Sequence, residues 1–117
     1  MQKEWFVLHT LTGQEQKVKE SILRRKKLEE MEELIGDVII PTEKVSEVKK
    51  GVKMTTTRKF FPGYVLINIV LYDDRKKLHE KSWYFVKETP GVIGLIGGEA
   101  PVPLRPEEVD SVLNRLS

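Results

Sequence analysis

Apolar residues gather in four short runs along the chain, and each run predicts a β-strand. The first spans residues 5–10 and is rich in aromatic and aliphatic side chains, a composition that favours strands. The run at 64–71 gives the strongest of the four predictions, and shorter runs follow at 38–41 and 92–97. Together they supply the strands of one sheet.

Between the runs at 5–10 and 38–41, apolar residues recur at helical spacing and predict a helix. Thr12 stands three residues before Glu15, which is the spacing of a capping box at a helix start. We expect this helix to run to about Leu34 and to stop at Gly36.

Two further helices are predicted in the second half of the chain. One is capped by Asp73-Asp74, runs to about Lys87, and ends at Thr89-Pro90-Gly91. The other opens at Pro106, a residue that suits the first helical position.

Residues 43–60 alternate loosely between apolar and polar side chains, and Lys49-Lys50-Gly51 has the composition of a turn. This pattern predicts a polar β-hairpin arm that is only partly packed against the rest of the chain.

The predicted order of elements is β-α-β-hairpin-β-α-β-α, which is typical of a split β-α-β fold. We therefore expect an α+β domain: a ferredoxin-like antiparallel sheet with helices on one face, a protruding β-hairpin arm and a C-terminal helix. The β-branched set Val65, Ile67 and Ile69 suits the face that the helices cover. The opposite face would expose the alternate residues, namely Trp5, Val7, His9, Tyr64, Leu66 and Asn68. Alternatively, the last helix or the arm folds over this apolar patch.

The composition is that of a globular domain with little net charge. With 117 residues, of which 39% are hydrophobic and 32% charged, the chain can bury a core as one domain. A formal net charge of +2 is too small to imply nucleic-acid binding. No apolar run approaches the roughly 20 residues of a membrane span. The first residues lack the apolar segment of a signal peptide, so we expect a cytoplasmic protein.

Residues for catalysis or metal binding are scarce. The chain has no cysteine, and neither His9 nor His79 has a partner at a metal-binding spacing. No nucleophile, base and orienting group can be nominated together. The glycines at 94, 97 and 98 do not form a phosphate loop. We therefore expect a protein that is not an enzyme and uses no cofactor or metal.

The segment Arg58-Lys59-Phe60-Phe61-Pro62-Gly63-Tyr64-Val65 carries the most information. Neighbouring residues on a strand point to opposite faces, so Phe60 and Phe61 cannot both enter one core unless the backbone bulges. An exposed aromatic beside two cations suggests a docking site. Burial of both rings in the core or at a sheet edge is an equally good interpretation.

Several motifs, in order along the chain, resemble the N-terminal domain of the NusG family of bacterial transcription elongation factors. The resemblance covers nearly all 117 residues, so residues 1–117 would form this one domain. It includes Trp5-Phe6-Val7, Gly13-x-Glu15, 38–43, 58–65, 89–92, 94–98, Pro101-x-Pro103 and 108–116.

The resemblance implies a domain that binds RNA polymerase and modulates elongation, pausing and termination. In the family, an apolar pocket docks on the coiled-coil clamp helices of the largest catalytic subunit. The matching positions here are Phe61, Tyr64, Leu66, Trp5 and His9, with Arg58 and Lys59 at the rim. We expect a monomer that does not bind a membrane.

Three departures from the family pattern change what is expected. The chain stops where a linker to a KOW domain would begin, so that domain is absent from this chain; contacts with Rho or a ribosomal protein would require it. About seven residues, Arg75 to Lys81, are extra and could lengthen the second helix. Glu88-Thr89 stands where some members read non-template DNA through Asn-Thr, and a carboxylate near phosphates is unfavourable.

These departures leave candidate contacts with upstream or non-template DNA, or with the polymerase cleft, at Arg75, Lys76, Lys77 and Thr89. The alternative for the three cations is a solvated helix turn.

A competing hypothesis is a single-stranded RNA-binding module, which shares the split β-α-β fold and a basic-aromatic strand. Against it, Pro62 interrupts that strand and Asn68 stands where a later aromatic is expected. An interaction scaffold of another kind is a third hypothesis.

Overall fold

The computed structural model describes residues 2–49, 51–59 and 62–116. Four strands form one antiparallel sheet in the order β2-β5-β1-β6. They are β1 (Glu4–Thr10), β2 (Ile35–Ile39), β5 (Tyr64–Ile69) and β6 (Val92–Leu95). The helices are α1 (Glu15–Leu28), α2 (Glu80–Lys87) and α3 (Pro106–Leu116). This order confirms the predicted ferredoxin-like α+β fold.

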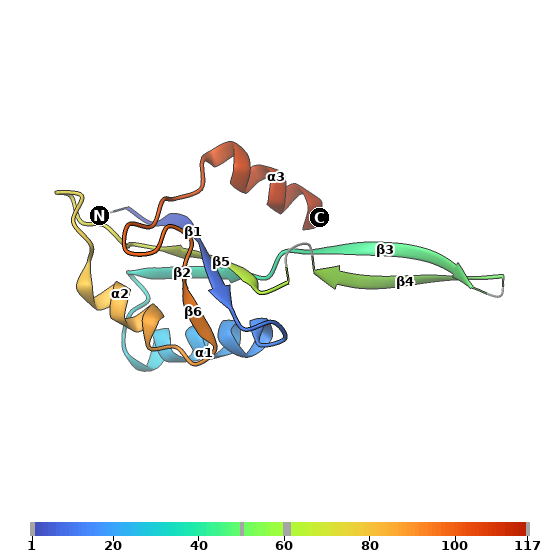
Figure 1. Ribbon diagram of the computed structural model, residues 1–117, viewed down its shortest axis with the longest axis horizontal. Helices are drawn as coiled ribbons and strands as arrows, with labels where there is room; N and C mark the ends of the chain where they lie inside the picture. The colour runs from blue at the N-terminus through green and yellow to red at the C-terminus, as the bar shows by residue number, and fades with distance from the viewer. Residues whose placement is uncertain (1, 50, 60–61, 117) are drawn as a thin grey trace.

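The sheet has helices on both sides. Figure 1 shows α1 and α2 on one side and α3 on the other. The predicted arm is confirmed: β3 (Thr42–Lys49) and β4 (Val52–Lys59) form a separate two-stranded sheet. The arm protrudes and stretches the molecule to 58 Å along its longest axis. Among the described residues, no helix is both long enough and apolar enough to cross a membrane.

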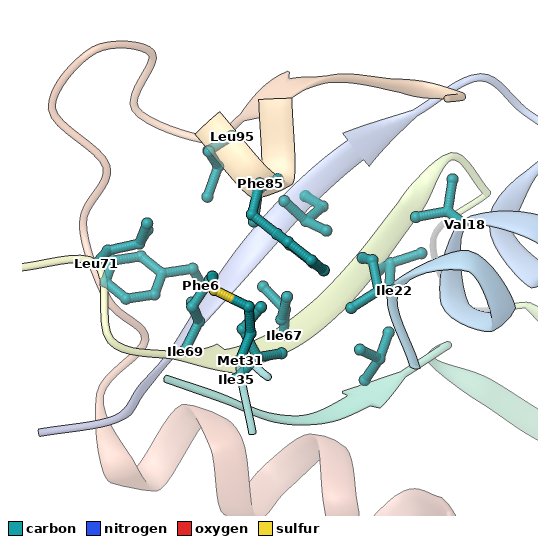
Figure 2. Close-up of a cluster of buried hydrophobic side chains, with 14 residues drawn as sticks. Phe6, Val18, Ile22, Met31, Ile35, Ile67, Ile69, Leu71, Phe85 and Leu95 are labelled. Carbon is teal, nitrogen blue, oxygen red and sulfur yellow. The ribbon is translucent and has the colours of Figure 1, made fainter. Parts of the chain in front are cut away.

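The hydrophobic core lies between the sheet and helices α1 and α2 (Figure 2). Phe6 and Leu8 of β1 are fully buried there, as are Val65, Ile67 and Ile69 of β5. The predicted division of these strands into a core face and an opposite face is therefore correct. Burying side chains of this size typically contributes about 1.5–3 kcal/mol each.

Helix α1 ends well before the predicted Leu34. Its last turn closes with Glu30 in a left-handed conformation (φ 54°) and a 2.7 Å hydrogen bond from the N–H of Met31 to the carbonyl of Lys26. This is the Schellman arrangement, in which glycine is the usual left-handed residue. Gly36, the predicted stop, lies within β2 instead.

Helix α2 begins later than the predicted residue 74. The side chain of Asp73 accepts hydrogen bonds from the N–H groups of Arg75 (2.8 Å) and Lys77 (3.0 Å), and so it stabilises a turn. The helix is capped instead by His79, whose Nδ1 accepts a hydrogen bond from the N–H of Ser82 at 3.4 Å. The prediction that residues 75–81 lengthen the helix is therefore wrong.

The predicted capping box at the start of α1 is also wrong. The N-cap residue is Gln14, and it makes no side-chain capping hydrogen bond. Glu15 is fully buried, and its Oε2 accepts a 2.9 Å hydrogen bond from the N–H of Gly63. The carboxylate therefore joins the start of α1 to a distant turn.

Arg25 connects α1 to the end of α2. Its Nη1 donates a 2.9 Å hydrogen bond to Thr89 Oγ1, and its guanidinium lies 4.3 Å from the centre of the Phe85 ring. Because the Arg25 side chain is only 20% exposed, these contacts are partly shielded from water.

We expect Arg25→Met to lower the free energy of unfolding by about 1–2 kcal/mol, because it removes a charged hydrogen bond and a cation–π contact. Denaturant unfolding followed by circular dichroism measures this change. Arg24→Met, at the exposed neighbouring position, is the matched control and should change stability by less than about 0.5 kcal/mol. Equal effects of the two substitutions would contradict the assigned role of Arg25.

Candidate functional site

The turn before β5 is fixed from two directions. Gly63 donates its N–H to Glu15, and its carbonyl accepts a 2.8 Å hydrogen bond from the N–H of Thr10. Its φ of +85° is one that side chains rarely adopt, and an added Cβ would lie 3.2 Å from the Thr10 carbonyl oxygen. The turn therefore delivers Tyr64 to the first position of β5 in a defined orientation.

Tyr64 and His9 form an aromatic pair across strands β5 and β1. They are opposite each other in the strand register, and their rings stack with centroids 5.0 Å apart and an interplanar angle of 14°. Both residues are half-buried, and they belong to the face opposite the core. The stack limits the positions that the Tyr64 ring can take.

A pocket of about 530 Å³ opens on this face of the sheet. Its described lining combines an apolar floor with a polar side: Val7, Pro41, Tyr64, Leu66, Leu104, Glu107, Glu108 and Ser111. Leu66 is only 4% exposed, because α3 and the segment that leads to it lie on this side (Figure 1). The alternative that the last helix folds over the face is thus correct in part, since a hollow remains.

The wall formed by α3 is held to the sheet by its approach segment. The N–H of Leu104 donates a 2.8 Å hydrogen bond to the carbonyl of Trp5, and Val109 is buried. Glu108 accepts hydrogen bonds from the backbone N–H and the Nε of Arg105, at 3.1 and 3.0 Å. The backbone hydrogen bond is the main reason that the pKa of Glu108 is lowered.

The structure brings together only some of the site residues predicted from the sequence. Tyr64 and Leu66 line the pocket, and His9 stacks on Tyr64. Trp5 is half-buried on the same face but is not among the described lining residues. Phe61 lies outside the described residues. Arg58 and Lys59 end β4, where they pair with Glu43 and Thr42 of β3.

Sequence reasoning missed the residues that come from other elements. Pro41 stands at the root of the arm, and Leu104, Glu107, Glu108 and Ser111 come from α3 and its approach. No local pattern marks these positions, because they become lining residues only when the root of the arm and α3 are placed beside the sheet.

The candidate DNA contacts fall into two different environments. Arg75, Lys76 and Lys77 are exposed in the turn that Asp73 stabilises, and Lys76 has a positive φ of 63°. Thr89 is only 2% exposed, and its hydroxyl donates a 2.9 Å hydrogen bond to the carbonyl of Phe85. A buried hydroxyl of this kind presents no surface to nucleic acid.

The fold and the pocket define a small α+β module with an apolar pocket on one face of its sheet. The described residues hold no group of three or more His, Cys, Asp or Glu side chains that could hold a metal ion. A family model described as "Transcription termination factor nusG" matches residues 3–113. The chain therefore belongs to the NusG family.

Individual relatives agree with this assignment. The chain is 42% identical over 119 residues to the transcription termination/antitermination protein NusG of Pseudomonas aeruginosa, and covers 63% of that protein's length. It is 41% identical over 120 residues to the NusG of Bacillus subtilis and covers 64% of it.

A solved structure, described as "Domain interaction in Thermotoga maritima NusG", matches with a TM-score of 0.73 at 28% identity. The match covers 97% of this chain and 56% of the other. The chain thus spans somewhat over half the length of the relatives that it resembles.

The turn at residues 73–77 should respond to acid. Hydrogen bonds from the backbone, that of Lys77 first, lower the pKa of Asp73. The carboxylate therefore stabilises the turn above its unfolded pKa, and this contribution is lost as the pH falls through the lower folded pKa. We expect the amide NMR signals of Arg75 and Lys77 to shift together in that range. A midpoint at or above the ordinary aspartate value of about 3.9 would contradict the assignment.

Proposed function

We propose that this domain binds RNA polymerase at the clamp helices of its largest catalytic subunit. The observation that supports this proposal is the apolar pocket between Tyr64, Leu66 and α3. Tyr64 and Leu66 are two of the positions at which the family resemblance implies a docking pocket. The domain would act by binding alone and would modulate elongation, pausing and termination while attached to the polymerase. The names of the relatives, termination and antitermination proteins, are consistent with that role.

The shape and chemistry of the pocket suit a helical partner. A partly exposed aromatic ring beside buried aliphatic groups is the kind of centre that carries most of the energy of an interface. An apolar side chain at the tip of a coiled coil would fill the hollow, as in other helix-in-groove contacts. Arg58 and Lys59, where the arm meets the sheet, are our proposed charged rim.

The RNA-binding alternative is less well supported. Modules of that class stack bases on an open sheet that carries several aromatic residues. Here α3 crosses that face (Figure 1), and β5 contributes only Tyr64 as an aromatic residue among Tyr64, Leu66 and Asn68. The remaining hollow is suited to an apolar side chain more than to a row of bases.

Partners of a longer protein are a separate proposal. The chain covers about 63% of the Pseudomonas aeruginosa relative, so contacts with Rho or a ribosomal protein are proposed only for a protein that also carries a KOW domain.

We expect Tyr64→Ala to weaken binding to a purified clamp-helix fragment about thirtyfold, which corresponds to about 2 kcal/mol. The substitution removes the ring that lines the pocket and leaves the core face of β5 unchanged. Titration calorimetry measures the affinity, and circular dichroism checks that the variant is folded.

Tyr84→Ala is the matched control, because Tyr84 is 56% exposed on α2, on the side of the sheet away from the pocket. It should bind like the unaltered domain. The proposed docking site is wrong if Tyr64→Ala also keeps the full affinity.

The cations Arg75, Lys76 and Lys77 are our proposed contact with upstream or non-template DNA in the elongation complex. Neutralising three phosphates gives a log–log salt dependence with a slope of about −3. Replacing all three residues with Gln should weaken binding to the full elongation complex and flatten this slope. Binding to the isolated clamp-helix fragment should not change. If neither affinity responds, the three residues are solvated surface.

A further inference from the structure

Glu15 is a buried acid close to the pocket that is not among the described lining residues. Its side chain is fully buried at the start of α1, although burying a carboxylate is unfavourable unless hydrogen bonds compensate for lost water. The position at the N-terminus of a helix provides part of that compensation. The hydrogen bond from the N–H of Gly63 provides another part, so the acid has a defined task at that turn.

That hydrogen bond is one half of a clamp on Gly63. The other half is the carbonyl of Gly63, which accepts a hydrogen bond from the N–H of Thr10 at the end of β1. The peptide units on both sides of the Gly63 Cα are therefore held, one by α1 and one by β1. Because glycine adopts φ values of either sign about equally readily, Gly63 does not fix its own φ of +85°, and this conformation depends on the two hydrogen bonds.

The clamped residue is followed directly by the aromatic ring of the pocket. Tyr64 stacks on His9 at 5.0 Å and lines the hollow together with Leu66. A change in φ or ψ at Gly63 would move Tyr64, and with it the direction in which the ring leaves the sheet. A binding group performs best when its supporting residues fix its geometry.

We propose that Glu15 is a positioning residue of the docking pocket, which acts through Gly63 to set the orientation of Tyr64. The inference rests on the proposed function in so far as the pocket is the docking site. It adds that affinity for the clamp helices depends on a buried acid that does not touch the partner.

The test compares three substitutions that alter the acceptor in different ways. Glu15→Ala removes the acceptor and should lower affinity for the clamp-helix fragment about tenfold. Glu15→Asp keeps the charge at the start of α1 but withdraws the carboxylate by one carbon–carbon bond, about 1.5 Å, and should also lose affinity. Glu15→Gln keeps an oxygen acceptor of the same reach, and it should restore binding to within about twofold of the unaltered domain.

A control separates positioning from loss of stability. Ile22 lies in the core on the same helix, and replacing it with Val removes one buried methylene and so lowers stability without changing the acceptor for Gly63. All variants are measured under conditions in which circular dichroism shows them fully folded. Ile22→Val should then keep the full affinity, whereas Glu15→Ala should not.

A second measurement needs no partner. The stacked Tyr64 ring shifts the NMR signals of the His9 ring, and this shift reports the geometry of the pair. It should be lost in Glu15→Ala and Glu15→Asp, and kept in Glu15→Gln and Ile22→Val.

The outcomes distinguish this inference from the proposed function. If Tyr64→Ala loses binding while Glu15→Ala and Glu15→Asp keep both affinity and the His9 shift, the positioning role is overturned and the docking site stands. If the clamp-helix fragment fails to bind even the unaltered domain, the proposed function fails. The His9 shift then still decides whether Glu15 sets the orientation of Tyr64. If Glu15→Ala does not fold, the affinity and the His9 shift of Glu15→Asp decide whether Glu15 positions Tyr64.

Discussion

The pairing of β1 with β5 is the constraint on which both the core and the pocket depend. Leu8 faces Val65 on the core side, and Val7 faces Leu66 on the pocket side. Because side chains alternate along a strand, a shift of β5 by one residue would exchange its core residues with its pocket residues. Val65 would then turn toward α3 and Leu66 into the core, and the hollow would lose part of its floor. One register therefore specifies the buried core and the lining of the pocket together.

The end of β1 is where that register is secured. The N–H of Thr10 binds the carbonyl of Gly63, and the N–H of the next residue, Leu11, binds the carbonyl of Gly91 at 2.9 Å. Both glycines have positive φ, and a Cβ on Gly91 would lie 3.0 Å from Val18 of α1. With Glu15 bound to Gly63, three distant family motifs meet around the start of α1. The three motifs are far apart in the sequence, but their residues form one cluster in the folded structure.

The two faces of the sheet were predictable from the sequence, because successive side chains on a strand point to opposite faces. This alternation alone places Ile67 on the core face and Leu66 on the pocket face. The helix boundaries were less predictable. Glu30 closes α1 where a glycine would have given a signal, and the apolar Met31 that follows continues the helical spacing. Asp73 offers the same side-chain acceptor to a turn as to a helix start. The polar wall of the pocket depends on where α3 lies, which no local pattern encodes.

The composition of the first turn of α3 explains why this helix leaves a hollow. Glu107 and Glu108 in the first turn of α3 line the pocket. If the helix packed closely against Leu66, these carboxylates would lose water without gaining enough hydrogen bonds to compensate. Arg105 instead holds Glu108 in an exposed ion pair at 3.0 Å. The helix therefore packs through Val109 and leaves the ring of Tyr64 only half-covered. A partner that inserts an apolar side chain can complete this burial without displacing either glutamate, because the polar wall keeps its contact with solvent.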